Sequence, residues 1–304
     1  MKVLITGATS MIGYAASERL LQDGHEVVAV VRRESEKLKA LTGTGRVTVV
    51  ICEMEDYGSV SEQVPFSVDA AFLTAWNGTR RPERDDPVLQ ETNYRCNMDL
   101  LPELIKMGCR KIVTAGSQAE YGPWTLDRKA TEEDIPHPNT EYGIYKLKFY
   151  LDAKKYLENT TVQLIEPRFF SIYGPEDYSG TMIISLLDKL LRNETCEMTK
   201  GIQTWDYLFI DDAIAGVEKL VIEDVAPGVY HFGSGDSFQL RHYVEEMYRI
   251  TGSKSELLFG AIPYPPTGMV NVNPDVSKLM ALGWTPKTSF EQGIRQILNH
   301  RFHC

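Results

Sequence analysis

The sequence predicts an α/β protein with a doubly wound parallel sheet and a smaller α+β domain. Three observations indicate this class. A glycine-containing turn at 6–13 joins the first apolar run to an amphipathic helix, strands and helices alternate up to about residue 168, and the alternation then stops. Parallel neighbouring strands need a crossover, usually a helix, so this order is typical of βαβ units.

Short apolar runs rich in β-branched residues mark the expected strands, at 2–5, 26–31, 47–51, 68–73, 112–115 and 162–165. Helical patterns lie at 14–22 and 88–107, and another begins at Tyr142. We expect a first domain at 1–168, to which 205–225 return, and a second domain formed mainly by 169–304. Helices such as 182–192, short strands and proline-rich turns make up the second domain.

Composition narrows the class of protein. Of the 304 residues 43% are hydrophobic and 24% are charged, which is ordinary for a soluble enzyme. The net charge of −10 argues against a nucleic-acid surface, and no apolar run approaches the roughly 20 residues that span a bilayer. The N-terminus lacks a signal-peptide core, so we expect a cytoplasmic protein with no nucleic-acid or membrane partner. The five scattered cysteines indicate reduced thiols, and we expect no metal site.

The turn Thr6-Gly7-Ala8-Thr9-Ser10-Met11-Ile12-Gly13 predicts a dinucleotide site. Small residues at 7, 10 and 13 would let the backbone approach a pyrophosphate at the helix N-terminus. The alternative is a glycine turn that serves only close packing. The expected contacts are Gly7, Thr9, Ser10, Met11, Ile12 and Gly13. On this prediction residues 1–168 are the dinucleotide-binding domain, and 169–304 form mainly a substrate-binding lid.

Arg32 and Arg33 follow the second strand, where an acidic residue would bind the ribose 2′-hydroxyl of NAD. They favour NADP(H), with NAD(H) as an alternative, unless they are only a solvated pair. Other strand ends add expected cofactor contacts. These are Glu53 and Met54 toward the adenine, Thr74, Ala75 and Trp76 toward the nicotinamide, and Pro167.

Tyr142 and Lys146 are four residues apart, so one face of a helix would present both side chains. A neighbouring ammonium lowers the pKa of a phenol by favouring the phenolate, and the pair could then serve as general acid or base. Ser117 follows the expected strand at 112–115 and could donate a hydrogen bond to a substrate carbonyl. The alternatives are a chance helical spacing and a serine that only caps the next turn.

Together these motifs resemble extended short-chain dehydrogenases/reductases of the nucleotide-sugar epimerase/dehydratase type, over essentially the whole chain. Further markers of the resemblance are Gly116–Gly122, Tyr173-Gly174-Pro175, Gly233-Ser234-Gly235 and Leu282–Pro286. The resemblance implies a Rossmann domain, and a homodimer through the helices of Met98 and Tyr142. It also implies that Ser117 and Tyr142 contact the reacting oxygen, while Lys146 binds the nicotinamide ribose and lowers the pKa of Tyr142.

Departures from the family pattern reduce the number of reactions that the chain is expected to catalyse. Gln118 and Ala119 stand where dehydratases of the family carry an Asp-Glu pair, which argues against a 4,6-dehydratase. Trp205 and Pro265 stand where arginines often hold the diphosphate, and Ser171 stands where asparagine is usual. The expected substrate contacts are Trp76, Ser117, Gln118, Tyr142, Ser171 and Trp205.

The sequence therefore predicts NADPH-dependent reduction of a 4-keto-6-deoxy nucleotide sugar, with Tyr142 as the proton donor. Three alternatives stay open. They are a nucleotide-sugar C4 epimerase with tightly held NAD, a reductase of a non-nucleotide ketone or aldehyde, and a sensor or scaffold that binds NADP(H) without catalysis.

Overall fold

The central feature is a mainly parallel sheet with the strand order β12-β7-β5-β4-β1-β2-β3 and β6 paired to β7. The computed structural model describes residues 1–124, 126–264 and 270–303. The strands are β1 (Lys2–Thr6), β2 (Glu26–Val31), β3 (Val47–Ile51), β4 (Ala70–Leu73), β5 (Lys111–Thr114), β6 (Gly116–Ser117), β7 (Gln163–Phe169) and β12 (Gly228–Phe232). The pairings from β3 to β7 are parallel, so the predicted doubly wound sheet is confirmed.

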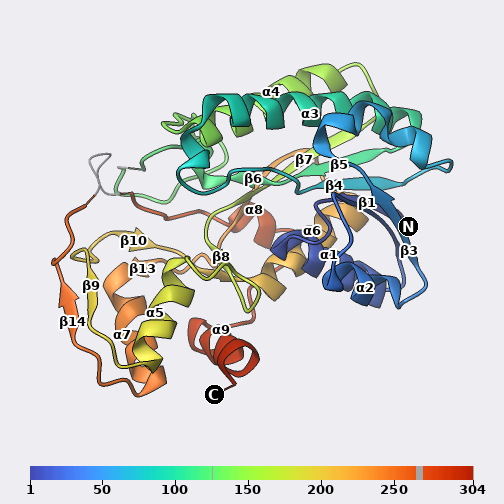
Figure 1. The fold of residues 1–304 in the computed structure, drawn as a ribbon. Coiled ribbons are helices and arrows are strands. Elements are labelled where there is room, and N and C mark those ends of the chain that lie inside the picture. The colour runs from blue at the N-terminus through green and yellow to red at the C-terminus, as the bar shows by residue number, and fades with distance from the viewer. Residues whose placement is uncertain (125, 265–269, 304) are drawn as a thin grey trace. The chain divides into compact units, whose positions relative to one another are not determined.

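Helices cover both faces of this sheet (Figure 1). On one face lie α3 (Pro87–Lys106) and α4 (Glu141–Leu157), which pack against each other. On the other face lie α1 (Met11–Gln22), α2 (Glu36–Thr42) and α6 (Ile210–Ile222). Because both faces are covered, the strands are mostly apolar, and Val3, Leu4 and Ile5 of β1 have no exposed surface.

The chain divides into two compact units. Unit 1 contains 1–122, 135–169 and 214–230, and unit 2 contains 123–134, 170–213 and 231–304. The segment expected to return to the first domain at 205–225 thus begins later in the structure, and 123–134 join unit 2. The assignment of one domain to the dinucleotide and the other to the substrate stays a prediction.

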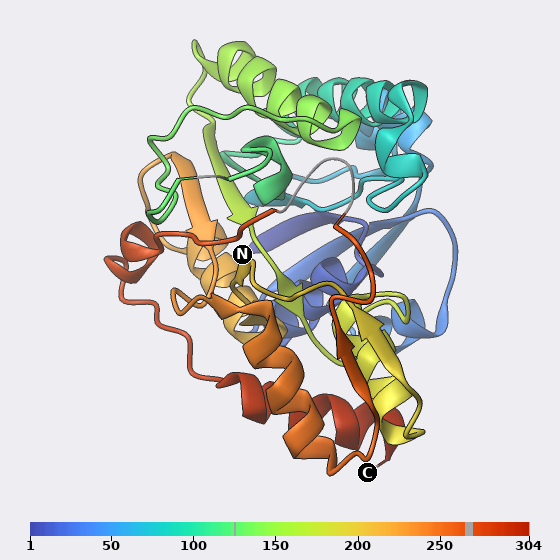
Figure 2. The same cartoon turned by 90° about the vertical axis from the view of Figure 1, so that its left-hand side faces the viewer.

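Unit 2 is made of helices and three two-stranded sheets (Figure 2). Its sheets pair β10 (Thr204–Trp205) with β13 (Phe238–Gln239), β11 (Leu208–Phe209) with β8 (Ile172–Tyr173), and β14 (Leu257–Phe259) with β9 (Cys196–Met198). Its helices are α5 (Met182–Leu191), α7 (Leu240–Thr251), α8 (Ser277–Met280), α9 (Phe290–Ile297) and a π-helix (Leu298–Phe302). α7 packs against both α5 and α9.

Three 3₁₀ helices complete unit 1, namely η1 (Met54–Gln63), η2 (Glu83–Asp85) and η3 (Gln118–Glu120). The first of them packs against α3. Within the described ranges, no helix is long and apolar enough to cross a membrane.

The start of α4 is fixed by a close backbone contact. Thr140 caps the helix, and its hydroxyl accepts a hydrogen bond from the Gly143 N–H at 3.1 Å. A Cβ atom built on Gly143 would lie 2.3 Å from the carbonyl oxygen of Ala119 in η3. Only glycine therefore allows the first turn of α4 to lie this close to η3.

This contact predicts that Gly143→Ala lowers the stability of the protein. Overpacking against backbone costs about 1–3 kcal/mol, and the better helix propensity of alanine returns up to about 1 kcal/mol. We expect a net loss of about 1–2 kcal/mol in the free energy of unfolding, measured by chemical denaturation.

Gly58→Ala is the matched control, because a Cβ atom at Gly58 meets only Cβ of Asp99, at 3.8 Å. Equal stability of the Gly143 and Gly58 variants would contradict the prediction.

Candidate active site

The turn between β1 and α1 is a narrow backbone cradle. Gly7 has a φ of +65°, and Ser10 caps α1 by accepting a hydrogen bond from the Gly13 N–H at 3.1 Å. A Cβ atom on Gly13 would lie 2.3 Å from the carbonyl oxygen of Gly7. Close packing alone thus requires glycine at 13. The first N–H groups of α1 have no partner within the helix, so the turn also has what an anion needs.

The end of β4 is tied to this turn. The backbone N–H groups of Thr74 and Ala75 both donate to the Thr6 hydroxyl, at 3.1 and 3.2 Å. The Thr74 hydroxyl donates to the Thr6 carbonyl at 2.6 Å. Two of the expected nicotinamide contacts therefore lie beside the expected pyrophosphate contacts.

The remaining expected cofactor residues lie at strand ends of unit 1. Arg32 and Arg33 directly follow β2, are exposed, and form no ion pair within the part of the chain that the structure describes. Glu53 is exposed and precedes η1, whereas Met54 and Pro167 are buried. The cradle and the two unpaired cations fit a dinucleotide phosphate.

The structure brings Ser117, Tyr142 and Lys146 together in unit 1. The Ser117 hydroxyl accepts a hydrogen bond from the Ala119 N–H at 3.2 Å, so the serine does cap η3. Its side chain also acts on the Tyr142 phenol, whose pKa it lowers. The Lys146 ammonium donates to the Ala115 carbonyl at 2.8 Å and lies 5.9 Å from the centroid of the Tyr142 ring.

The electrostatics correct one expectation. Burial raises the pKa of Tyr142, while the Ser117 side chain and the charge of Arg84 lower it. The charge of Arg84 is the one that lowers the pKa of this phenol. Arg84, on η2, lies with its Cζ atom 4.6 Å from the centroid of the Tyr142 ring. Sequence reasoning missed Arg84, whose signal was only the run of charged residues from Thr79 to Asp86.

The pKa of Lys146 is also shifted from its ordinary value. Burial lowers the pKa of its ammonium to about 8, against the opposing charges of Glu120 and Glu166. Its Nζ atom lies 4.0 Å from the centroid of the Trp76 ring. The arrangement can hold a neutral phenol as a proton donor at neutral pH, next to a lysine that titrates near pH 8.

The expected substrate contacts fall into both units. In unit 1, the Trp76 N–H donates to the Gln90 side chain at 2.7 Å, so only the indole ring is left for a ligand, and Gln118 is half-buried beside Ser117. In unit 2, Ser171 is half-buried, and Nε1 of Trp205 is buried without a hydrogen-bond partner within the described ranges. Pro265 lies outside the described residues.

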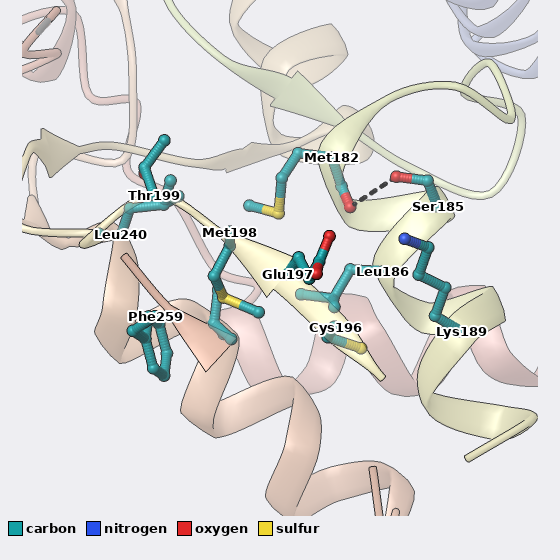
Figure 3. Close-up of a pocket in the computed structure, with 12 residues that line it drawn as sticks. Met182, Ser185, Leu186, Lys189, Cys196, Glu197, Met198, Thr199, Leu240 and Phe259 are labelled. Carbon is teal, nitrogen blue, oxygen red and sulfur yellow. Dashed lines mark hydrogen bonds between the residues drawn. The ribbon is translucent and has the colours of Figure 1, made fainter. Parts of the chain in front are cut away.

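Unit 2 holds a cavity of about 130 Å³ that the sequence did not reveal (Figure 3). Its apolar lining comes from α5, α7 and the β9–β14 pair, and includes Met182, Leu186, Met198, Leu240, Val244 and Phe259. Polar groups are few, and include Lys189, Glu197 and Thr199. A mostly apolar lining with a few polar groups is typical of a small-molecule site.

Comparisons with known proteins agree with this geometry. The chain is 25% identical to CDP-abequose synthase of Salmonella muenchen, over 98% of this chain and 97% of that protein. It is 24% identical to dTDP-6-deoxy-L-talose 4-dehydrogenase (NAD(P)(+)) of Kitasatospora kifunensis, over 97% and 94% of the two chains. The crystal structure of UDP-glucose 4-epimerase from Thermotoga maritima has the same fold, with a TM-score of 0.88 and 22% identity over 99% of this chain and 98% of that one.

A model of the family described as "NAD dependent epimerase/dehydratase family" matches residues 3–233, well over half of the chain. The predicted resemblance is thereby confirmed. The protein belongs to the NAD-dependent epimerase/dehydratase family and is an NAD(P)-dependent enzyme.

Proposed function

We propose that the protein reduces the 4-keto group of a nucleotide-linked 4-keto-6-deoxy sugar, with NADPH as the preferred reductant. The observation that carries the proposal is the buried Tyr142, which has a raised pKa and lies on α4 near Ser117 and Lys146. Such a phenol can give a proton to an oxygen that gains negative charge. The names of the relatives from Salmonella and Kitasatospora support a nucleotide-sugar substrate.

The residues that would hold the cofactor are those of the glycine cradle with Arg32 and Arg33. When bound, the reduced cofactor supplies a hydride and is itself oxidised. The carbonyl carbon gains this hydride, and the carbonyl oxygen takes the proton of the Tyr142 hydroxyl. Ser117 donates a hydrogen bond to the same oxygen, and solvent returns a proton to Tyr142. Lys146 holds a positive charge near the phenol and binds the ribose.

The candidate nucleotide site is the cavity of unit 2. The flat ring of Phe259 and the side chains of Met182 and Met198 offer an apolar surface to an aromatic base. Lys189 and Glu197 offer charged groups that could recognise its polar edge. The predicted homodimer stays a prediction. Ile144 and Leu151 of α4 are 40% and 52% exposed, as an unfilled helical interface would require.

The second candidate function is a C4 epimerase, because the same three side chains would serve oxidation followed by reduction at one carbon. UDP-glucose 4-epimerase shares the fold. The unpaired Arg32 and Arg33 favour an exchangeable NADPH over a retained NAD. Cofactor that stays bound through purification, with interconversion of 4-hydroxy sugars, would favour the epimerase.

The test of the proposed function is NADPH oxidation with CDP-, dTDP-, UDP- and GDP-linked 4-keto-6-deoxy sugars. We expect turnover on at least one of them. Tyr142→Phe should lower kcat at least about 100-fold, because the proton donor is lost while the ring remains. Its NADPH affinity should match that of the native protein. Intact turnover by Tyr142→Phe at saturating cofactor would exclude Tyr142 as the donor, and activity only on simple ketones would exclude the nucleotide sugar.

The arginine pair predicts the cofactor preference. In Arg32→Asp/Arg33→Ser we expect kcat/KM for NADPH to fall at least about tenfold, because losing a charge-assisted hydrogen bond to the 2′-phosphate costs about 1.5–3 kcal/mol. The value for NADH should stay or rise. Lys39→Ser is the control, since Lys39 is an exposed cation on α2 that pairs with Glu36. A native protein that prefers NADH would contradict this assignment.

The shifted pKa values of Tyr142 and Lys146 predict how the rate of reduction depends on pH. Tyr142 keeps its proton throughout the neutral range because its pKa is raised. Lys146 has a pKa of about 8 and is charged below that pH. We therefore expect kcat/KM to be level near neutral pH and to fall as pH rises through about 8, as Lys146 loses its proton. Activity that stays level up to about pH 10, the ordinary pKa of a phenol, would contradict a role for the lysine charge.

A further inference from the structure

Three ionisable side chains form a buried cluster behind the candidate active site. Glu120, Glu166 and Arg168 are 0%, 1% and 2% exposed. Arg168 donates through Nη2 to Glu120 at 2.7 Å, and through Nε and Nη2 to Glu166 at 3.1 and 2.7 Å. The Arg168 guanidinium also lies 4.6 Å over the Tyr121 ring. Removing ionisable groups from water costs free energy, so a fully buried cluster of three such side chains is expected to have a structural or functional role.

The cluster contains two carboxyl groups but only one guanidinium group. Burial and the neighbouring Glu120 raise the pKa of Glu166 well above its ordinary value. The Nη2 atom of Arg168 donates to both carboxyl groups and so ties Glu120 to Glu166.

Glu120 also reaches the active site directly. Its Oε1 atom accepts the backbone N–H of Ser117 at 2.7 Å, while its Oε2 atom accepts Arg168. The Ser117 hydroxyl in turn accepts the Ala119 N–H, which completes a capping box around η3. A Cβ atom on Gly116 would lie 2.7 Å from the Glu166 carboxyl carbon, so β6 is pressed against the cluster.

We propose that Glu120 is a positioning residue, which fixes Ser117 for catalysis through the serine backbone while Arg168 and Glu166 fix Glu120. Glu120 touches neither cofactor nor substrate. It acts by holding the residue that donates to the reacting oxygen. The effect of Glu120 on catalysis rests on the proposed function. The positioning of Ser117 by Glu120 rests only on the contacts given above.

The experiment compares Glu120→Gln with Glu166→Gln. In Glu120→Gln, an amide cannot accept from both Ser117 and Arg168, so the weaker contact with the Ser117 N–H is lost. In Glu166→Gln, the amide oxygen can still accept from Arg168, and the hydrogen bond from the Ser117 N–H to Glu120 is not altered. The two variants make the same chemical change at neighbouring buried sites. Only the first of them affects Ser117.

For Glu120→Gln we expect kcat to fall between about 10-fold and 100-fold with unchanged NADPH affinity, because small misplacements of a catalytic group have effects of this size. In Glu166→Gln we expect kcat to fall less than in Glu120→Gln, because the hydrogen bond from the Ser117 N–H to Glu120 is kept. In a Ser117→Ala background, Glu120→Gln should have no further effect on kcat, since the two act as one unit. Equal loss in both glutamine variants, or an additive loss on top of Ser117→Ala, would overturn the proposal.

A second readout needs no substrate. Hydrogen exchange at the Ser117 amide should be faster in Glu120→Gln and unchanged in Glu166→Gln. Unchanged exchange in Glu120→Gln would overturn the proposal even if no substrate is found. Faster exchange with no turnover on any nucleotide sugar would instead count against the proposed function alone. Where Glu120→Gln does not fold, Glu120→Asp replaces it, because aspartate keeps the charge for Arg168 but is too short to reach Ser117. The same results are expected.

Discussion

The candidate active site depends on the close approach of two backbones, the first turn of α4 and the short η3 helix. Gly143 lies against the Ala119 carbonyl with no room for a Cβ atom. Tyr142 and Lys146 are carried by α4, and Ser117 by the turn that begins η3. The proximity of Ser117 and Tyr142 thus follows from a contact that contains no catalytic atom. This explains why a glycine directly follows the tyrosine in the sequence.

Burial decides the chemistry of the groups that this contact assembles. It raises the pKa of Tyr142 and lowers the pKa of Lys146, so each group is moved toward its neutral form. Arg84 acts against this change on the tyrosine, and Glu120 and Glu166 act against it on the lysine. The site therefore combines a phenol suited to giving a proton with a lysine that holds its charge only below about pH 8. Reduction of a carbonyl needs this combination.

The sequence carried most of the sheet and the three candidate catalytic residues, because apolar strands and helical spacing are local properties. It did not predict η1, a 3₁₀ helix that packs on α3 and whose buried residues Met54, Tyr57 and Val60 recur every third position. It also missed Arg84 and the cavity of unit 2, which depend on a short 3₁₀ turn and on strands of two or three residues. The direction of the Tyr142 pKa shift was wrong, because spacing shows a nearby cation but not the burial that outweighs it.

The central claim is net hydride transfer to a sugar carbon, with Tyr142 supplying the proton. The most direct measurement uses NADPH carrying deuterium at nicotinamide C4, with the keto sugar that the protein accepts. The account predicts one deuterium on the former carbonyl carbon of the product, in amounts equal to the NADP⁺ formed. A product without carbon-bound deuterium, or a deuterium that stays with the cofactor while sugar epimers interconvert, would contradict it.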